Sequence, residues 1–235
     1  LVHEIGQEEM TRLVEEEFAR IDASQVLSVP AKELERIAAY FAPPTYENLP
    51  AEQAEHTQAL NTNDGFRRWV DTNVVTHKVS GYAIVNISLK PIGGIPGDAS
   101  SEQMRVIAEI AERFGMDEIR VTHEQNLVLP NVKQSDLKAV YDRLNAQDLA
   151  TANHGLISDS IACPGLDYCD LANARSIPLA QDISNRFADL DRQKNIGELK
   201  IKISGCINAC GHHHVGHIGI LGVDKKGTEF YQITL

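Results

Sequence analysis

Four cysteines in the C-terminal part of the chain are the residues best suited to chemistry. Cys163 and Cys169 lie in ACPGLDYC, Cys206 and Cys210 lie in SGCINAC, and the sequence has no others. Sets of four thiolates bind zinc or iron–sulfur clusters. Structural zinc sites usually separate paired ligands by two to four residues, whereas the first pair here is spaced C-x5-C and the second C-x3-C. The spacing favours a 4Fe-4S cluster, with zinc as the alternative.

Together, ACPGLDYC and SGCINACGHHH resemble the cluster signature of the siroheme-dependent nitrite and sulfite reductases. In that family the four cysteines hold a 4Fe-4S cluster and the last one also bridges to the siroheme iron. The resemblance therefore implies that the four cysteines are the cluster ligands and that Cys210 is the bridging one. Upstream, GGIPGDASSEQMRVIAEIAERFGMDEIRVTHEQNLVLPNV resembles the second ferredoxin-like half-domain of the family, so the resemblance covers residues 61–235.

The same resemblance implies which residues face the siroheme. Siroheme carries many carboxylates, and its site needs cationic and amide donors. The implied donors are Arg120, Thr122, Gln125 and Asn126 in IRVTHEQN, and Asn208 between the last two cysteines. Simpler alternatives are a surface charge for Arg120 and a turn for Gln125-Asn126.

The activity implied by the resemblance is six-electron reduction of sulfite to sulfide, with reduction of nitrite to ammonia as the alternative. The electron donor would be a ferredoxin or a flavoprotein subunit. Substrate-contacting Arg and Lys residues in the family come chiefly from the N-terminal half of the enzyme. Because this chain starts without Met and ends in an alternating segment, we expect a fragment truncated at both ends and inactive alone. The other classes are an iron–sulfur electron-transfer protein without siroheme and a zinc-stabilised interaction module.

Composition and apolar runs limit the cellular compartments and the kinds of partner that we expect for this protein. The 235 residues are 43% hydrophobic and 23% charged, as in ordinary globular proteins. No apolar run approaches the roughly 18 residues of a membrane span, and the N-terminus lacks a signal-peptide pattern. We therefore expect a cytoplasmic protein without a membrane partner, whose cysteines bind metal rather than form disulfides.

The net charge of −11 argues against a nucleic-acid partner. Residues 1–60 hold twelve acidic and four basic side chains, so the rest of the chain is nearly neutral. The acidic segment is expected to be a solvated helix face.

Apolar periodicity predicts the elements that position the candidate residues. Helical spacing over Gln7–Ile21 and Ala31–Phe41 predicts two helices, and the polar segment Pro43–Asp64, with its Asn63-Asp64-Gly65 turn signal, predicts a linker. We expect a helical lead segment and linker over residues 1–60. A ferredoxin-like half-domain is expected over 61–150, and an incomplete siroheme and 4Fe-4S cluster α/β domain over 151–235. The fold class is α+β.

Within the half-domain the pattern is β-α-β-β-α. Alternation predicts a strand over Tyr82–Leu89, and shorter strands are expected at Glu118–Thr122 and Asn126–Leu129. Ser100 or Ser101 can cap the first helix. The apolar residues expected to line one face of that helix are Met104, Ile107, Ala108, Ala111 and Phe114, and those of the second helix are Leu137, Val140, Tyr141 and Leu144.

In the cluster region, Pro164 suits the start of a helix over Leu166–Ala174 whose amides would face the metal. A strand is expected over Lys200–Ser204, with Lys200 and Lys202 on a solvated face. Gly205 and Gly211 would let the backbone approach a bulky cofactor, or would serve turn geometry. The consecutive His212–His214 are not expected to converge on one ion, because adjacent side chains diverge.

Overall fold

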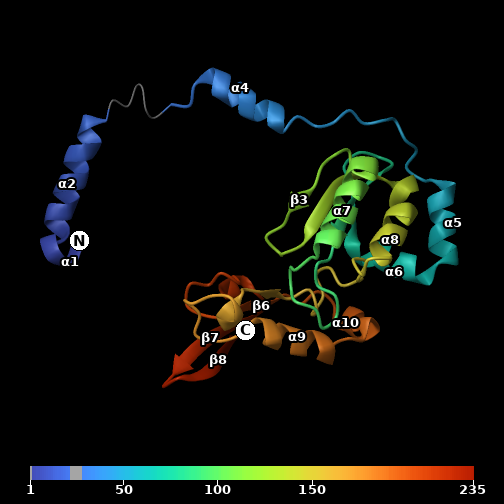
Figure 1. The fold of residues 1–235 in the computed structure, drawn as a ribbon. Coiled ribbons are helices and arrows are strands. Elements are labelled where there is room, and N and C mark those ends of the chain that lie inside the picture. The colour runs from blue at the N-terminus through green and yellow to red at the C-terminus, as the bar shows by residue number, and fades with distance from the viewer. Residues whose placement is uncertain (1, 22–27) are drawn as a thin grey trace. The chain divides into compact units, whose positions relative to one another are not determined.

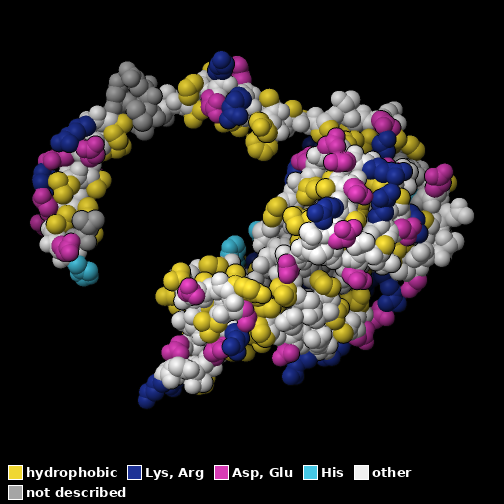
Figure 2. All heavy atoms as spheres, viewed as in Figure 1, with side chains coloured by type: hydrophobic (Ala, Val, Ile, Leu, Met, Phe, Trp, Pro, Cys, Tyr) yellow, Lys and Arg dark blue, Asp and Glu magenta, His cyan; other side chains and the backbone are white. Residues whose placement is uncertain are grey.

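The computed structural model describes residues 2–21 and 28–235 and divides into two compact units, Leu1–Thr45 and Tyr46–Leu235 (Figure 1). The first unit contains helices α1 (Val2–Ile5), α2 (Gln7–Arg20) and α4 (Ala31–Tyr40), which confirms the two predicted helices. None of its described residues is buried. Apolar side chains lie exposed beside acidic ones on α2 (Figure 2).

Helix α5 (Ala54–Thr62) lies within the segment predicted as a linker, and helix α6 (Asp64–Asn73) begins at its last residue. The linker prediction was therefore wrong over most of its C-terminal half. The turn signal is a helix cap: the Asn63 side chain accepts a hydrogen bond from the Phe66 amide at 2.8 Å. Phe66 and Trp69 on α6 are fully buried, and this burial in the core stabilises a helix with a polar sequence.

The half-domain contains an antiparallel sheet in the order β1-β2-β4-β3. Its strands are β1 (Val74–Thr76), β2 (Tyr82–Ile87), β3 (Arg120–Val121) and β4 (Leu127–Lys133). Helices α7 (Ser101–Phe114) and α8 (Leu137–Asn145) pack together, and α7 contacts β4. The predicted β-α-β-β-α order is confirmed, with one additional strand before it.

Helix α7 begins with a capping box in which Ser100 and Gln103 satisfy each other's backbone amides. Its buried face consists of Ile107, Ile110 and Ala111. The expected face was partly wrong, because Met104 is 62% exposed and Ala108 is also exposed. Helical spacing alone leaves the edge of an apolar stripe uncertain by about one residue position.

The cluster region forms a second sheet in the order β5-β6-β7-β8. Strands β5 (Ile161–Ala162), β6 (Ile201–Ser204) and β7 (Ile218–Lys225) are parallel, and β8 (Thr228–Thr234) is antiparallel to β7. The connection from β5 to β6 contains α9 (Ile177–Arg186) and α10 (Leu190–Ile196). The expected division of residues 61–235 near residue 150 stays a prediction.

The helix expected over Leu166–Ala174 was wrong. Only a 3₁₀ turn, η2 (Gly165–Asp167), forms there, because Gly165 has a left-handed φ of 59° that interrupts the helical path. Further along, the amides of Asn173 and Ala174 donate to Gly205 O rather than to a helical carbonyl. The segment is therefore a loop folded onto the second cysteine motif.

Candidate metal centre

Two neighbouring parallel strands bring the cysteine loops together. Cys163 directly follows β5, and Cys206 follows β6 by two residues. Ala162 pairs with Ile203 in the parallel ladder, and the Cys163 amide donates to Ile203 O at 3.1 Å. The carboxyl ends of parallel strands lie at one edge of a sheet, which is the usual place for a binding site in such folds.

The loops are also bonded directly to each other. The Gly205 amide donates to Cys163 Sγ at 3.0 Å. Gly205 O in turn accepts the amides of Asn173 at 2.8 Å and Ala174 at 3.1 Å. Cys163 Sγ also lies 3.4 Å from Ser176 Oγ. The first thiol is thus held by the second cysteine motif and by Ser176, which follows the first motif.

All four cysteines are free thiols, and their exposure differs. Cys163 and Cys206 are each 8% exposed, Cys169 is partly buried, and Cys210 is exposed. An amide donating to sulfur favours the thiolate form and tunes the potential of an iron–sulfur cluster. Four free thiols on two hydrogen-bonded loops are chemically suited to serve as ligands of an iron–sulfur cluster, and the thiol of Cys163 also accepts an amide hydrogen bond.

The glycines beside the cysteines are required by backbone packing. A Cβ at Gly211 would lie 1.9 Å from Ile203 O, and a Cβ at Gly205 would lie 2.7 Å from Ala174 O. Either contact would push apart backbone segments that cannot give way. The close approach expected for these glycines is therefore made to protein backbone.

The residues predicted to face siroheme have distinct surroundings. Arg120 is exposed and its Nε donates to Glu118 at 2.6 Å, and Asn208 is also exposed. Thr122 Oγ1 accepts the Asn126 amide at 3.1 Å, closing the turn between β3 and β4. Gln125 alone of these residues bonds next to the cysteines, through the backbone of Ala162. Their contacts with siroheme stay predictions.

Asn126 is 1% exposed, and its amide group is used inside the protein. Its Oδ1 accepts the Leu89 amide at 3.1 Å, and its Nδ2 donates to Asp159 Oδ1 at 2.9 Å. This bonding makes Asn126 a structural link between the half-domain and the segment that leads into Cys163.

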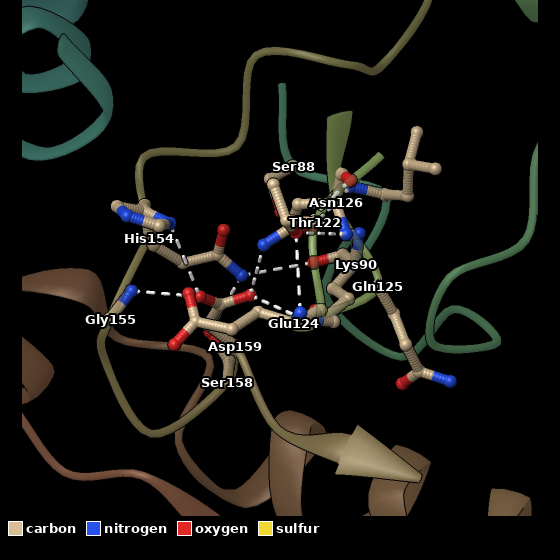
Figure 3. Close-up of polar contacts among 12 residues, drawn as sticks. Ser88, Lys90, Thr122, Glu124, Gln125, Asn126, His154, Gly155, Ser158 and Asp159 are labelled. Atoms are coloured by element: carbon tan, nitrogen blue, oxygen red, sulfur yellow. Dashed lines mark hydrogen bonds and ion pairs between the residues drawn. The ribbon is translucent and has the colours of Figure 1, made fainter. Parts of the chain in front are cut away.

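Next to Asn126 lies a buried ion pair between Lys90 and Asp159, which sequence reasoning missed (Figure 3). Lys90 Nζ lies 2.7 Å from Asp159 Oδ1, with side chains 2% and 3% exposed. Lys90 also donates to Glu124 O, and the Gly155 amide donates to Asp159 Oδ2 at 2.8 Å. No local sequence signal identifies this pair, because its partners lie in separate loops and meet only in the folded chain.

The charges around Asp159 keep it ionised. Burial by itself raises the pKa of Asp159, but His154, Lys90 and the Gly155 amide outweigh burial and the pKa is lowered. His154 Nδ1 lies 3.5 Å from Asp159 Oδ2, without a well-directed hydrogen bond. Burial lowers the pKa of Lys90, and Asp159 opposes that shift.

Glu124, His154 and Asp159 offer donor atoms within 4.8 Å of one another, a spacing that could hold a metal ion. Their charges are already matched, because Lys90 pairs with Asp159 and Lys200 Nζ lies 3.1 Å from Glu124 Oε1. The group therefore forms a balanced polar network. Lys202, expected on a solvated face, is buried nearby at 5% exposure.

An open hollow of about 440 Å³ lies beside the first cysteine loop. Its walls come from the Pro- and Gly-rich segment before α7, the β3–β4 turn and the loop after β5. The lining residues include Ile95, Pro96, Gly97, Gln125, Pro164 and Tyr168.

Within residues 2–21 and 28–235, no helix has the length and apolar character to cross a membrane.

Residues 87–147 match the model of the nitrite/sulfite reductase ferredoxin-like half domain. Sulfite reductase [ferredoxin] 2 of Mycolicibacterium paratuberculosis is 30% identical over 135 residues, covering 56% of this chain and 24% of that protein. The chloroplastic ferredoxin–nitrite reductase of Zea mays is 30% identical over 158 residues, covering 65% and 26%. The chain thus spans about a quarter of the length of these curated relatives.

Among solved structures, the Mycobacterium tuberculosis NirA protein is similar in fold, with a TM-score of 0.55 and 24% identity. That match covers 69% of this chain and 30% of the other. The half-domain match, the named relatives and the shared fold agree with one another. Over part of its length the chain is therefore similar to nitrite and sulfite reductases, and residues 87–147 match their ferredoxin-like half domain.

Proposed function

We propose that this chain is the cofactor-binding part of an enzyme that reduces sulfite to sulfide with a siroheme and a 4Fe-4S cluster. The observation that carries the proposal is the hydrogen bond from the Gly205 amide to Cys163 Sγ, which joins the two cysteine loops. A disulfide scaffold would not leave all four cysteines as free thiols, and a surface interaction module would not need two bonded cysteine loops.

In this proposal Cys163, Cys169, Cys206 and Cys210 hold the cluster, and Cys210 also bridges to the siroheme iron. The exposure of Cys210 leaves its thiol free to serve a second group. When bound, the two cofactors supply single electrons and an iron that holds the substrate. The chain contributes ligand placement, an amide donor at Cys163 and a cavity wall beside it.

Siroheme carboxylates would be bound by two exposed polar residues, Arg120 and Asn208. Arg120 is suited to this role because its own side chain is 63% exposed, and an ion pair that solvent reaches, as here with the partly exposed Glu118, is weak. Gln125 lines the hollow itself. Thr122 and Asn126 contribute by maintaining the turn that carries Gln125.

Sulfite is the proposed substrate and nitrite is the second candidate, because the curated relatives include both sulfite and nitrite reductases. The names of both relatives include ferredoxin, so a ferredoxin is the proposed electron donor and a flavoprotein subunit is the alternative. We place the enzyme in the cytoplasm. Since the chain spans about a quarter of its relatives' length, we propose that it does not turn over substrate alone.

The test uses the complete enzyme, purified without added cofactors. Visible spectra should show the siroheme macrocycle band together with cluster absorption. Cluster absorption without the macrocycle band would instead indicate an electron-transfer protein. Steady-state rates with reduced ferredoxin and either sulfite or nitrite then assign the substrate. A higher kcat/KM for sulfite supports the proposal, and a higher value for nitrite replaces it with the nitrite reaction.

A further inference from the structure

We infer that Gln125 is a positioning residue for Cys163: its carboxamide takes the place of a neighbouring strand on the outer edge of β5. This inference rests on the proposed function for its meaning, because Cys163 is there a cluster ligand. The contacts of Gln125 give the β3–β4 turn of the half-domain a role in fixing the first thiol.

Strand β5 is an edge strand with β6 on one side only. In a parallel ladder, alternate residues direct their backbone groups to opposite sides. The Cys163 amide bonds to Ile203 on β6, so the N–H and C=O of the preceding Ala162 face the outer edge. Ala162 is only 3% exposed, so both groups need a partner from the protein.

Gln125 supplies both partners. Its Nε2 donates to Ala162 O at 2.8 Å, and its Oε1 accepts from the Ala162 amide at 3.0 Å. This pair of bonds copies what a further strand would provide. The carboxamide is thereby engaged at both ends, which leaves it little capacity to bind a cofactor carboxylate as well.

The backbone of Gln125 supports a specific role for its side chain. Its φ of 57° lies in the left-handed region, where a non-glycine residue is strained. Gly97 packs closely against it, because a Cβ at Gly97 would lie 3.0 Å from Gln125 Cβ. Close packing and two side-chain bonds hold the strained residue in one position.

The next residue of the turn holds the other end of the same segment. Asn126 Nδ2 donates to Asp159 Oδ1 at 2.9 Å, and Asp159 also pairs with the buried Lys90. Consecutive turn residues therefore hold Asp159 and Ala162, which frame the approach to Cys163. A movement of the β3–β4 turn would therefore displace Ala162 and, with it, Cys163.

The first experiment measures Cys163 in cofactor-free protein. In a variant with the other three cysteines changed to Ser, the reaction of Cys163 with 4,4′-dithiodipyridine reports how often the β5 edge opens. Gln125→Leu should raise the rate at neutral pH about tenfold or more, since both Ala162 bonds are lost. Gln181→Leu is the matched control: Gln181 Nε2 bonds to Gly93 O at 3.0 Å, again between the two parts of the unit but to a residue outside β5.

Gln125→Glu keeps the test valid if the leucine variant does not fold. A protonated glutamate can both donate and accept, as glutamine does, whereas an ionised glutamate cannot donate to Ala162 O. The ratio of the Cys163 labelling rate in Gln125→Glu to that in the parent protein should approach one at pH values below the pKa of the new carboxyl group. The ratio should increase at pH values above that pKa. A general loss of stability would not reverse on acidification.

Reconstitution with iron and sulfide separates this inference from the proposed function. If the parent chain takes up no iron, the proposed function fails while the labelling result still decides the role of Gln125. If the parent takes up iron, Gln125→Leu should also shift the cluster's midpoint potential, and Gln181→Leu should not. The inference is overturned if Gln125→Leu and Gln125→Glu label Cys163 at the parent rate at every pH.

Discussion

The Gly205 amide donates a hydrogen bond to Cys163 Sγ over 3.0 Å, and this bond links two cysteine motifs that are far apart in the sequence. It joins the end of β5 to the end of β6, where parallel pairing already brings the strands together. The thiol that receives the bond is one of the two buried cysteines. The two loops are thus joined both by strand pairing and by a hydrogen bond to a thiol.

The packing of Gly211 predicts a large effect of adding one methyl group. Gly211→Ala would place a Cβ 1.9 Å from Ile203 O on β6, and we expect it to lower the unfolding free energy by about 3 kcal/mol or more. Urea denaturation measures this. Gly227→Ala, where a Cβ meets nothing within 4 Å and only the φ of +77° adds strain, should cost less, about 1 kcal/mol. A Gly211→Ala variant as stable as the parent would show that crowding at Gly211 is unimportant.

The buried ion pair predicts a strong effect of removing one partner. Lys90→Met leaves the Asp159 carboxylate buried without its cation, and we expect a loss of about 3–5 kcal/mol. Lys90→Met combined with Asp159→Leu should recover part of this loss, because no buried charge remains. Lys200→Met, at a partly exposed pair, should cost less than about 1 kcal/mol. A single Lys90→Met variant as stable as the parent would contradict the ion pair.

The lowered pKa of Asp159 predicts how stability depends on acid. The folded-state pKa lies below the unfolded value of about 3.9, so the stabilisation is complete above that value and is lost as pH falls through the folded pKa. The stability difference between the parent and Asp159→Asn should stay constant near neutral pH. It should shrink below about pH 4, as measured by denaturant titrations at several pH values. If the stability difference between the parent and Asp159→Asn grew as pH fell, the pKa of Asp159 would be raised rather than lowered by folding, which would contradict this prediction.

Arg120 tests the predicted siroheme contacts without disturbing the fold. Its pair with Glu118 is exposed, so Arg120→Met should change stability by less than about 1 kcal/mol. If Arg120 binds a siroheme carboxylate, the complete enzyme should retain less siroheme per chain, as measured by macrocycle absorbance. Arg105→Met is a control on an exposed arginine of α7. Equal siroheme content in both variants would remove Arg120 from the site.

Local patterns predicted the elements whose sequence and surroundings agree. The alternating strand β2 and the capped helix α7 are where apolar period and capping indicated. Helix α5 was missed because its sequence is polar and its caps are weak. The loop after Cys163 was misjudged because the left-handed backbone of Gly165 is set by packing against Ser176, a non-local contact.

In the candidate site too, local sequence predicted some residues, whereas the roles of others depend on contacts between distant segments. The four cysteines could be selected from type and spacing, because thiolates in pairs have few other uses. The role of Gln125 at β5, and the pairing of Lys90 with Asp159, depend on which loops meet in three dimensions. A sequence pattern carries no signal for such long-range polar contacts.

The cysteine quartet is tested most directly by iron, sulfide and zinc analysis of the chain after anaerobic reconstitution, with each cysteine changed to Ser in turn. The account predicts about four iron and four sulfide per chain, with a marked loss of both in each of the four variants. Zinc bound in preference to iron, or iron uptake unchanged when the cysteines are replaced, would contradict it.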